Sequence, residues 1–60
     1  MRFVKEYANW KVRSLQAMKT NFPERSSKID ANCLRINRLV LEWSMGLITT
    51  DEAMRTISEF

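Results

Sequence analysis

The first third of the chain alternates apolar and polar residues with a helical period. Heptad-like spacing places one set of positions along a single helix face: Val4, Ala8, Lys11, Leu15, Met18 and Phe22. Such spacing is typical of a helix that lies along another helix. Pro23 follows this set and disfavours helical geometry in the residue before it. We therefore predict a first helix over residues 2–21.

The middle of the chain carries the most regular apolar pattern. Its main row, again with heptad-like spacing, contains Ile29, Cys33, Ile36, Val40 and Trp43. This row predicts a second helix over residues 24–45. The helix starts either with Pro23 at its first position or with Ser26 or Ser27 as its N-cap. We expect the main row to pack against the first helix through Val4, Leu15, Met18 and Phe22.

A second apolar row lies on another side of the same helix. Leu34, Leu41 and Met45 lie roughly 120° to 160° around the axis from the main row. A helix with two apolar faces is expected to pack on both. Two arrangements satisfy this expectation: a second copy of the chain covers the row, or the third helix folds over it. In the second arrangement the exposed apolar face is instead an aromatic row on the first helix, formed by Phe3, Tyr7 and Trp10.

Residues 46–60 predict a tight turn and a third helix. Gly46 follows the second helix, where a residue in the left-handed conformation commonly ends a helix. Thr49 and Glu52 have the spacing of a capping box, and Ile48 and Ala53 that of a hydrophobic staple. We therefore predict a third helix over residues 50–59. Residues 1–60 are then a single all-α domain of three helices, completed by oligomerisation.

The C-terminal third resembles a known type of bacterial helical hairpin. Within residues 41–60, the run Met-Gly-Leu-Ile-Thr at 45–49 is followed by Asp51 and Glu52. This stretch is similar to the Gly-hydrophobic-Ile-Thr-x-x-Glu hairpin of short C-terminal domain modules. The resemblance implies a role in oligomerisation or localisation. The chain departs from that pattern at Ala53, where a large aromatic residue is common.

A second resemblance involves the start of the chain. Residues 3–9, together with the same C-terminal hairpin, resemble short uncharacterised reading frames of Gram-positive phages, plasmids and conjugative elements. This resemblance implies an accessory protein of a mobile element. It assigns no functional residues.

Length and composition favour association with other chains. A domain of 60 residues buries only about 60% of its unfolded surface and is marginally stable unless something reinforces it. A single cysteine allows no intrachain disulfide, and without histidine it cannot build a tetrahedral zinc site. Because 45% of the residues are nevertheless hydrophobic, we predict self-association, most simply as a homodimer, and binding to another protein. No cofactor or metal is expected.

Catalytic chemistry is not expected either. The chain has no histidine for acid–base catalysis, and its one glycine leaves no glycine-rich phosphate loop. Asp51 and Glu52 are adjacent, so on a helix they point about 100° apart, and helix capping explains them better than catalysis. Cys33 lies within the main apolar row, where cysteine behaves as a small buried hydrophobe. We predict a non-enzymatic protein-binding module, and we hypothesise that it is a phage or mobile-element modulator of a host protein.

The charge distribution raises an alternative function, that of a small basic DNA-binding accessory protein acting as a dimer. The net charge is +3, and the basic residues are concentrated on the first helix. In a helix-turn-helix the second helix of the motif enters the major groove, but here that helix carries Asp51, Glu52 and Glu59, which phosphate repels. An anionic partner is therefore expected to meet the first helix at Arg2, Lys5, Asn9 and Arg13.

Cysteine usage and hydropathy bear on localisation. A lone cysteine suits a reducing compartment, and Arg2, Lys5 and Glu6 interrupt any signal-peptide core. No apolar run approaches the roughly 18 residues of a membrane span. We expect a soluble, cytoplasmic protein.

Overall fold

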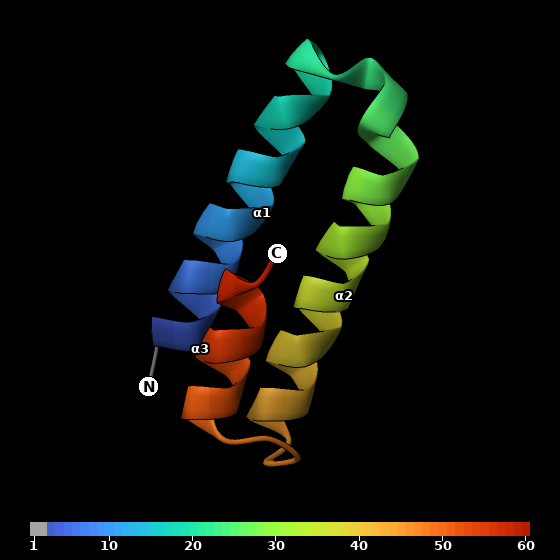
Figure 1. Cartoon of the computed structure of the whole chain (residues 1–60). Coiled ribbons are helices and arrows are strands. Elements are labelled where there is room, and N and C mark those ends of the chain that lie inside the picture. Colours follow the sequence, from blue (N-terminus) through green and yellow to red (C-terminus); the bar gives the residue numbers. More distant parts are fainter. Residues whose placement is uncertain (1–2) are drawn as a thin grey trace.

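A computed structural model describes residues 3–60. These residues form helix α1 (Phe3–Asn21), a short 3-10 helix η1 (Pro23–Arg25), helix α2 (Ser26–Ser44) and helix α3 (Thr50–Ser58). Because this part of the chain has no strand, the predicted all-α fold with three α-helices is confirmed. Figure 1 shows α1 and α2 as an antiparallel hairpin, with α3 packed against both near the start of α1. We call that end of the hairpin the α3 end and the opposite end the η1 end.

The connection at the η1 end differs from both predicted starts of the second helix. Phe22 leaves helical geometry, with φ −133° and ψ 67°, as expected for a residue before proline. Pro23 begins the 3-10 helix, and the Arg25 N–H donates to the Phe22 carbonyl over 2.9 Å. α2 then starts at Ser26 with Arg25 at the N-cap position and no side-chain cap. The predictions of Pro23 as the first α2 residue and of Ser26 or Ser27 as its N-cap are therefore wrong.

The end of α2 forms the predicted glycine turn. Gly46 has a φ of +78°, in the left-handed region. Its N–H donates to the Trp43 carbonyl over 3.0 Å, and the Leu47 N–H donates to the Glu42 carbonyl over 2.9 Å. This pair of bonds is a Schellman motif, which satisfies carbonyl groups that the end of a helix leaves free.

The start of α3 forms the predicted capping box. The Glu52 N–H donates to Thr49 Oγ1 over 3.1 Å, and the Thr49 N–H donates to Glu52 Oε1 over 3.3 Å. Ile48 packs against the core and Ala53 is fully buried, as expected for a hydrophobic staple. Trp43 Nε1 also donates to Thr50 Oγ1 over 3.0 Å, which ties the end of α2 to the start of α3.

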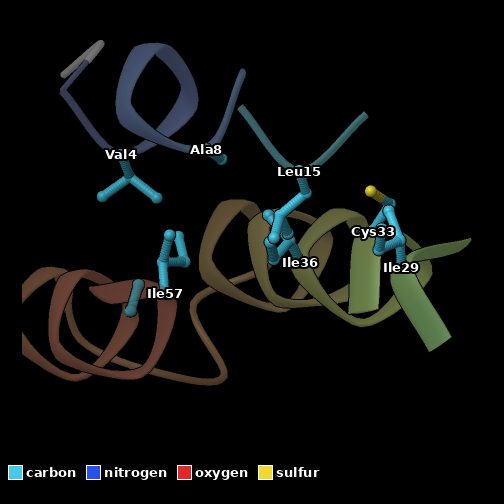
Figure 2. Packing of buried hydrophobic residues seen from close by; sticks show 8 residues of the cluster. Val4, Ala8, Leu15, Ile29, Cys33, Ile36 and Ile57 are labelled. Atoms are coloured by element: carbon cyan, nitrogen blue, oxygen red, sulfur yellow. The ribbon is translucent and has the colours of Figure 1, made fainter. Parts of the chain in front are cut away.

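The core is a single apolar cluster to which all three α-helices contribute. Figure 2 shows Val4 of α1 pointing toward Ile57 of α3, and Leu15 of α1 meeting Ile36 of α2. Burying one large aliphatic side chain contributes about 1.5–3 kcal/mol to folding. Within residues 3–60 the buried apolar side chains are Val4, Ala8, Leu15, Ile29, Cys33, Ile36, Ala53 and Ile57.

The predicted α1–α2 packing is confirmed where Leu15 meets Ile36 (Figure 2), and it is wrong at the η1 end. At the α3 end Val4 is buried but points toward Ile57 of α3 (Figure 2). Met18 and Phe22 keep 37% and 39% of their surface exposed. The physical reason is the length of α3, whose nine residues span only about 13 Å at 1.5 Å per residue. α2, with 19 residues, spans about 28 Å. The hairpin therefore has a third helix along only half of its length, as Figure 1 shows.

Candidate interaction surfaces

The second apolar row of α2 is exposed to solvent. Leu34, Leu41 and Met45 are 70%, 58% and 62% exposed. At 100° per residue they fall within about 40° of one another, and they span about 16 Å along the helix. We call these three residues the α2 row.

α3 does not cover the α2 row. It packs against α1 and α2 through Ala53 and Ile57, which are fully buried, while all three residues of the α2 row remain exposed. The predicted arrangement in which the third helix folds over this row is therefore wrong. The α2 row is a free apolar surface of the folded chain.

The aromatic row of α1 is divided between surface and core. Phe3 and Trp10 are 68% and 58% exposed, whereas Tyr7 is half-buried and packs against the core. The Tyr7 and Trp10 rings stack with their centroids 5.8 Å apart and their planes 15° from parallel. The free aromatic surface therefore consists of Phe3 and Trp10, with Tyr7 as a support beneath Trp10.

The α2 row lies beside α1. The side of α2 that meets α1 is marked by the ion pair between Lys19 and Asp30. On the helix wheel Asp30 lies within about 60° of all three residues of the α2 row. The row therefore runs along the edge of α2 that borders α1.

Lys19 and Asp30 fix this side of the hairpin electrostatically. The hydrogen bond from Lys19 lowers the pKa of the Asp30 carboxyl, against an opposing effect of desolvation and with further help from the Lys19 charge and a hydrogen bond from Gln16. Gln16 Nε2 also donates to the Sγ of buried Cys33 over 3.4 Å. Gln16 and Lys19 are therefore polar contacts that hold α1 against α2.

The predicted anion-binding face is exposed along α1. Lys5, Asn9 and Arg13 are all exposed and follow one another at four-residue intervals. Arg2, the fourth residue of this prediction, lies outside the described residues. The one ion pair within residues 3–60 joins Lys19 to Asp30, so Lys5 and Arg13 form none in this part of the chain. They remain available to an anionic partner.

A groove at the η1 end was not predicted from the sequence. It has a volume of about 380 Å³ and lies between α1 and α2, beyond the end of α3. Its apolar lining comes from Leu15, Met18, Ile29 and Phe60, and its basic lining from Arg25 and Lys28. We call this site the open groove. It depends on where α3 ends relative to the hairpin, which the apolar periodicity of each helix does not reveal.

Among residues 3–60, no group of three His, Cys, Asp or Glu side chains is placed to hold a metal ion. None of the helices in this part combines the length and the apolar character that crossing a membrane requires.

Comparisons with known proteins add no homologue. No protein-family model, curated protein or solved structure matches this chain. The resemblances to short C-terminal domain modules and to reading frames of mobile elements therefore stay predictions, as does a role in modulating a host protein.

Proposed function

We propose that the chain is a non-enzymatic protein-binding module that self-associates through the α2 row. The observation that carries this proposal is that Leu34, Leu41 and Met45 remain mostly exposed in a chain whose third helix is already docked elsewhere. Soluble monomers rarely keep contiguous apolar patches of more than a few hundred Å². A second copy of the chain is the simplest cover for this one.

The geometry and energetics of the row support a two-fold dimer. A straight apolar row on a helix can pack against its own copy across a two-fold axis, which is the commonest symmetry of soluble oligomers. Burying one leucine fully is worth about 1.5–3 kcal/mol, so six side chains from two copies offset an association cost of about 4–15 kcal/mol. Phe3 and Trp10 offer a smaller surface, because Tyr7 between them is already half-buried.

Light scattering of three variants tests the proposal. We expect the wild type at micromolar concentration to have twice the 7.1 kDa mass of the single chain. Leu41→Glu should return it to the single-chain mass, because a charge in a closed apolar interface is costly. Trp10→Glu should leave the dimer intact. Ala17→Glu, at an exposed α1 position, is the control for the added charge.

The same experiment distinguishes the competing surfaces. A wild-type mass of 7.1 kDa would rule out self-association. If only Trp10→Glu lost the dimer, the interface would be the surface formed by Phe3 and Trp10 and not the α2 row. Leu41 is 58% exposed in the folded chain, so Leu41→Glu should keep the helical circular dichroism signal of the wild type. A fall from the dimer mass to the single-chain mass would then not be caused by unfolding.

DNA binding by a dimer is the second candidate function, supported by the exposed Lys5, Asn9 and Arg13. Binding through these residues must weaken steeply as salt rises, because each phosphate contact releases counterions. Titration of a duplex at two salt concentrations, with wild type and Arg13→Glu, tests it. If the affinity for the duplex depended neither on salt concentration nor on Arg13, this surface would be excluded as a DNA-binding site.

A further inference from the structure

The open groove is the empty half of a site that holds a helix in its other half. α3 lies along the hairpin from the α3 end and ends at Ser58, and Phe60 lines the near end of the groove. The difference between about 28 Å of α2 and about 13 Å of α3 leaves a length of about 15 Å, or roughly ten helical residues. In Figure 1 the part of the α1–α2 hairpin above the C-terminal end has no third helix alongside it.

The charged side chains that line the groove are all basic. Arg25 and Lys28 line it, and no Asp or Glu is among its lining residues. The nearby carboxylate of Asp30 is paired with Lys19 and projects about 160° around α2 from Lys28. The Arg25 side chain makes a cation–π contact, because its guanidinium lies over the Phe22 ring, 5.0 Å from the centroid. The groove therefore combines an apolar floor with two cations, and its lining contains no acidic side chain.

α3 itself shows that this type of site accepts the apolar edge of an amphipathic helix. Its inner edge places Ala53 and Ile57 at full burial, while Asp51, Glu52 and Arg55 stay exposed on its outside. α3 is docked in the half of the site that adjoins the open groove, and the acidic character of the proposed occupant rests on Arg25 and Lys28 alone. At the boundary, the Arg35 guanidinium lies 5.8 Å from the centroid of the Phe60 ring.

We propose that the open groove binds an acidic amphipathic helix of another protein. About three turns of the partner helix would fill the free length. Its apolar side chains would contact Leu15, Met18 and Ile29, and its carboxylates would lie beside Arg25 and Lys28. Helix-in-groove recognition of this kind uses apolar anchors spaced by three or four residues, and complementary charge sets orientation and specificity. This site is separate from the α2 row and does not depend on self-association.

A second copy of the chain is a poor occupant of the groove. Its α3 already has its apolar edge buried in its own core. Its α2 row borders α1, the helix that carries Lys5 and Arg13, and would bring further cations toward Arg25 and Lys28. Like charges brought together in this way oppose association.

Nuclear magnetic resonance with synthetic helices tests the proposal on the full chain. The probe is a helix-stabilised three-turn peptide with leucines along one edge and glutamates elsewhere, and its control carries lysines in place of the glutamates. We expect the acidic peptide to shift the Leu15, Met18 and Ile29 resonances saturably. The lysine peptide should bind at least about tenfold more weakly, because its charges meet Arg25 and Lys28.

Two charge-reversal variants complete the test. Lys28→Glu should weaken the acidic peptide by about tenfold or more, and it should preserve the fold because an acidic residue near a helix N-terminus is favourable. Arg38→Glu, at an exposed position on α2 outside the groove lining, is the matched control and should bind as the wild type does. Equal binding of both peptides, no effect of Lys28→Glu, or shifts at Leu34 and Leu41 instead would overturn the proposal. Groove shifts that depend on protein concentration without peptide would identify a second copy as the occupant and also overturn it.

Discussion

Ile36 is the residue on which the hairpin depends most directly. Its side chain is fully buried at the centre of the core, where Leu15 of α1 meets it in Figure 2. Ile36→Asp would bury a charge without a partner, which costs several kcal/mol and approaches the total stability of about 5 kcal/mol expected for so small a domain. We therefore expect Ile36→Asp to abolish the cooperative thermal transition seen by circular dichroism.

Ala17→Asp provides a control outside the proposed interface. Ala17 is exposed on α1, so the same new charge remains in water and should change the melting temperature only slightly. Cooperative melting of Ile36→Asp at the wild-type temperature, or equal loss in both variants, would contradict the packing described above.

At the scale of residues, periodicity predicted most of the inward-facing positions. Val4, Leu15 and Ile36 were expected in the core and are buried, because a 3.6-residue period fixes which side of a helix a residue occupies. Met18 on that side of α1 and Phe22 just after the helix remain more than a third exposed. Their exposure depends on how far a third helix reaches, and periodicity within α1 contains no information about that length.

Among the elements, helix ends with local chemistry were predictable and the end without it was not. Gly46 and the Thr49–Glu52 box specify their conformations through their own side chains, or the lack of one, and both formed as expected. The start of α2 has no side-chain cap. Serines at 26 and 27 favoured a cap there, but the 3-10 turn after Pro23 brings both inside the helix.

Substitution of Gly46 tests the α2–α3 turn. A Cβ at position 46 would meet no atom within 4 Å, so Gly46→Ala is penalised by backbone strain alone, at about 1–2 kcal/mol for the left-handed conformation. Gly46→Val, which is β-branched, should lose at least as much. Thermal or denaturant melts measure both, and wild-type stability in both variants would exclude a role for the left-handed glycine.

The capping box can be tested separately with a threonine pair. Thr49→Ala removes the oxygen that accepts the Glu52 N–H, and it should lower the free energy of unfolding by about 1 kcal/mol. Thr20→Ala, at an exposed position within α1, should be neutral or slightly stabilising because alanine favours helix. Equal effects of the two substitutions would mean that the cap contributes nothing to stability.

For the molecule as a whole, the structure predicts two ends of unequal stability. The side chains with 2% exposure or less belong to Val4, Ala8, Ile36, Ala53 and Ile57, and four of these five lie on α3 or the first turns of α1. At the η1 end Leu15, Ile29 and Cys33 keep 4–7% of their surface exposed. Because α3 seals one end only, the α3 end should dominate folding while the η1 end stays open to a partner.

Truncations at the two ends of the hairpin test this division. Ile57→Ala should lower the free energy of unfolding by roughly 2–5 kcal/mol, since it leaves a cavity where all three helices meet. Met18→Ala should cost much less, because Met18 is 37% exposed and faces the open groove. Chemical denaturation of the two variants gives both values. If Met18→Ala proved as destabilising as Ile57→Ala, the groove would be closed in solution and could not receive a helix. A large loss confined to Ile57→Ala would establish that α3 is the element that holds this hairpin together.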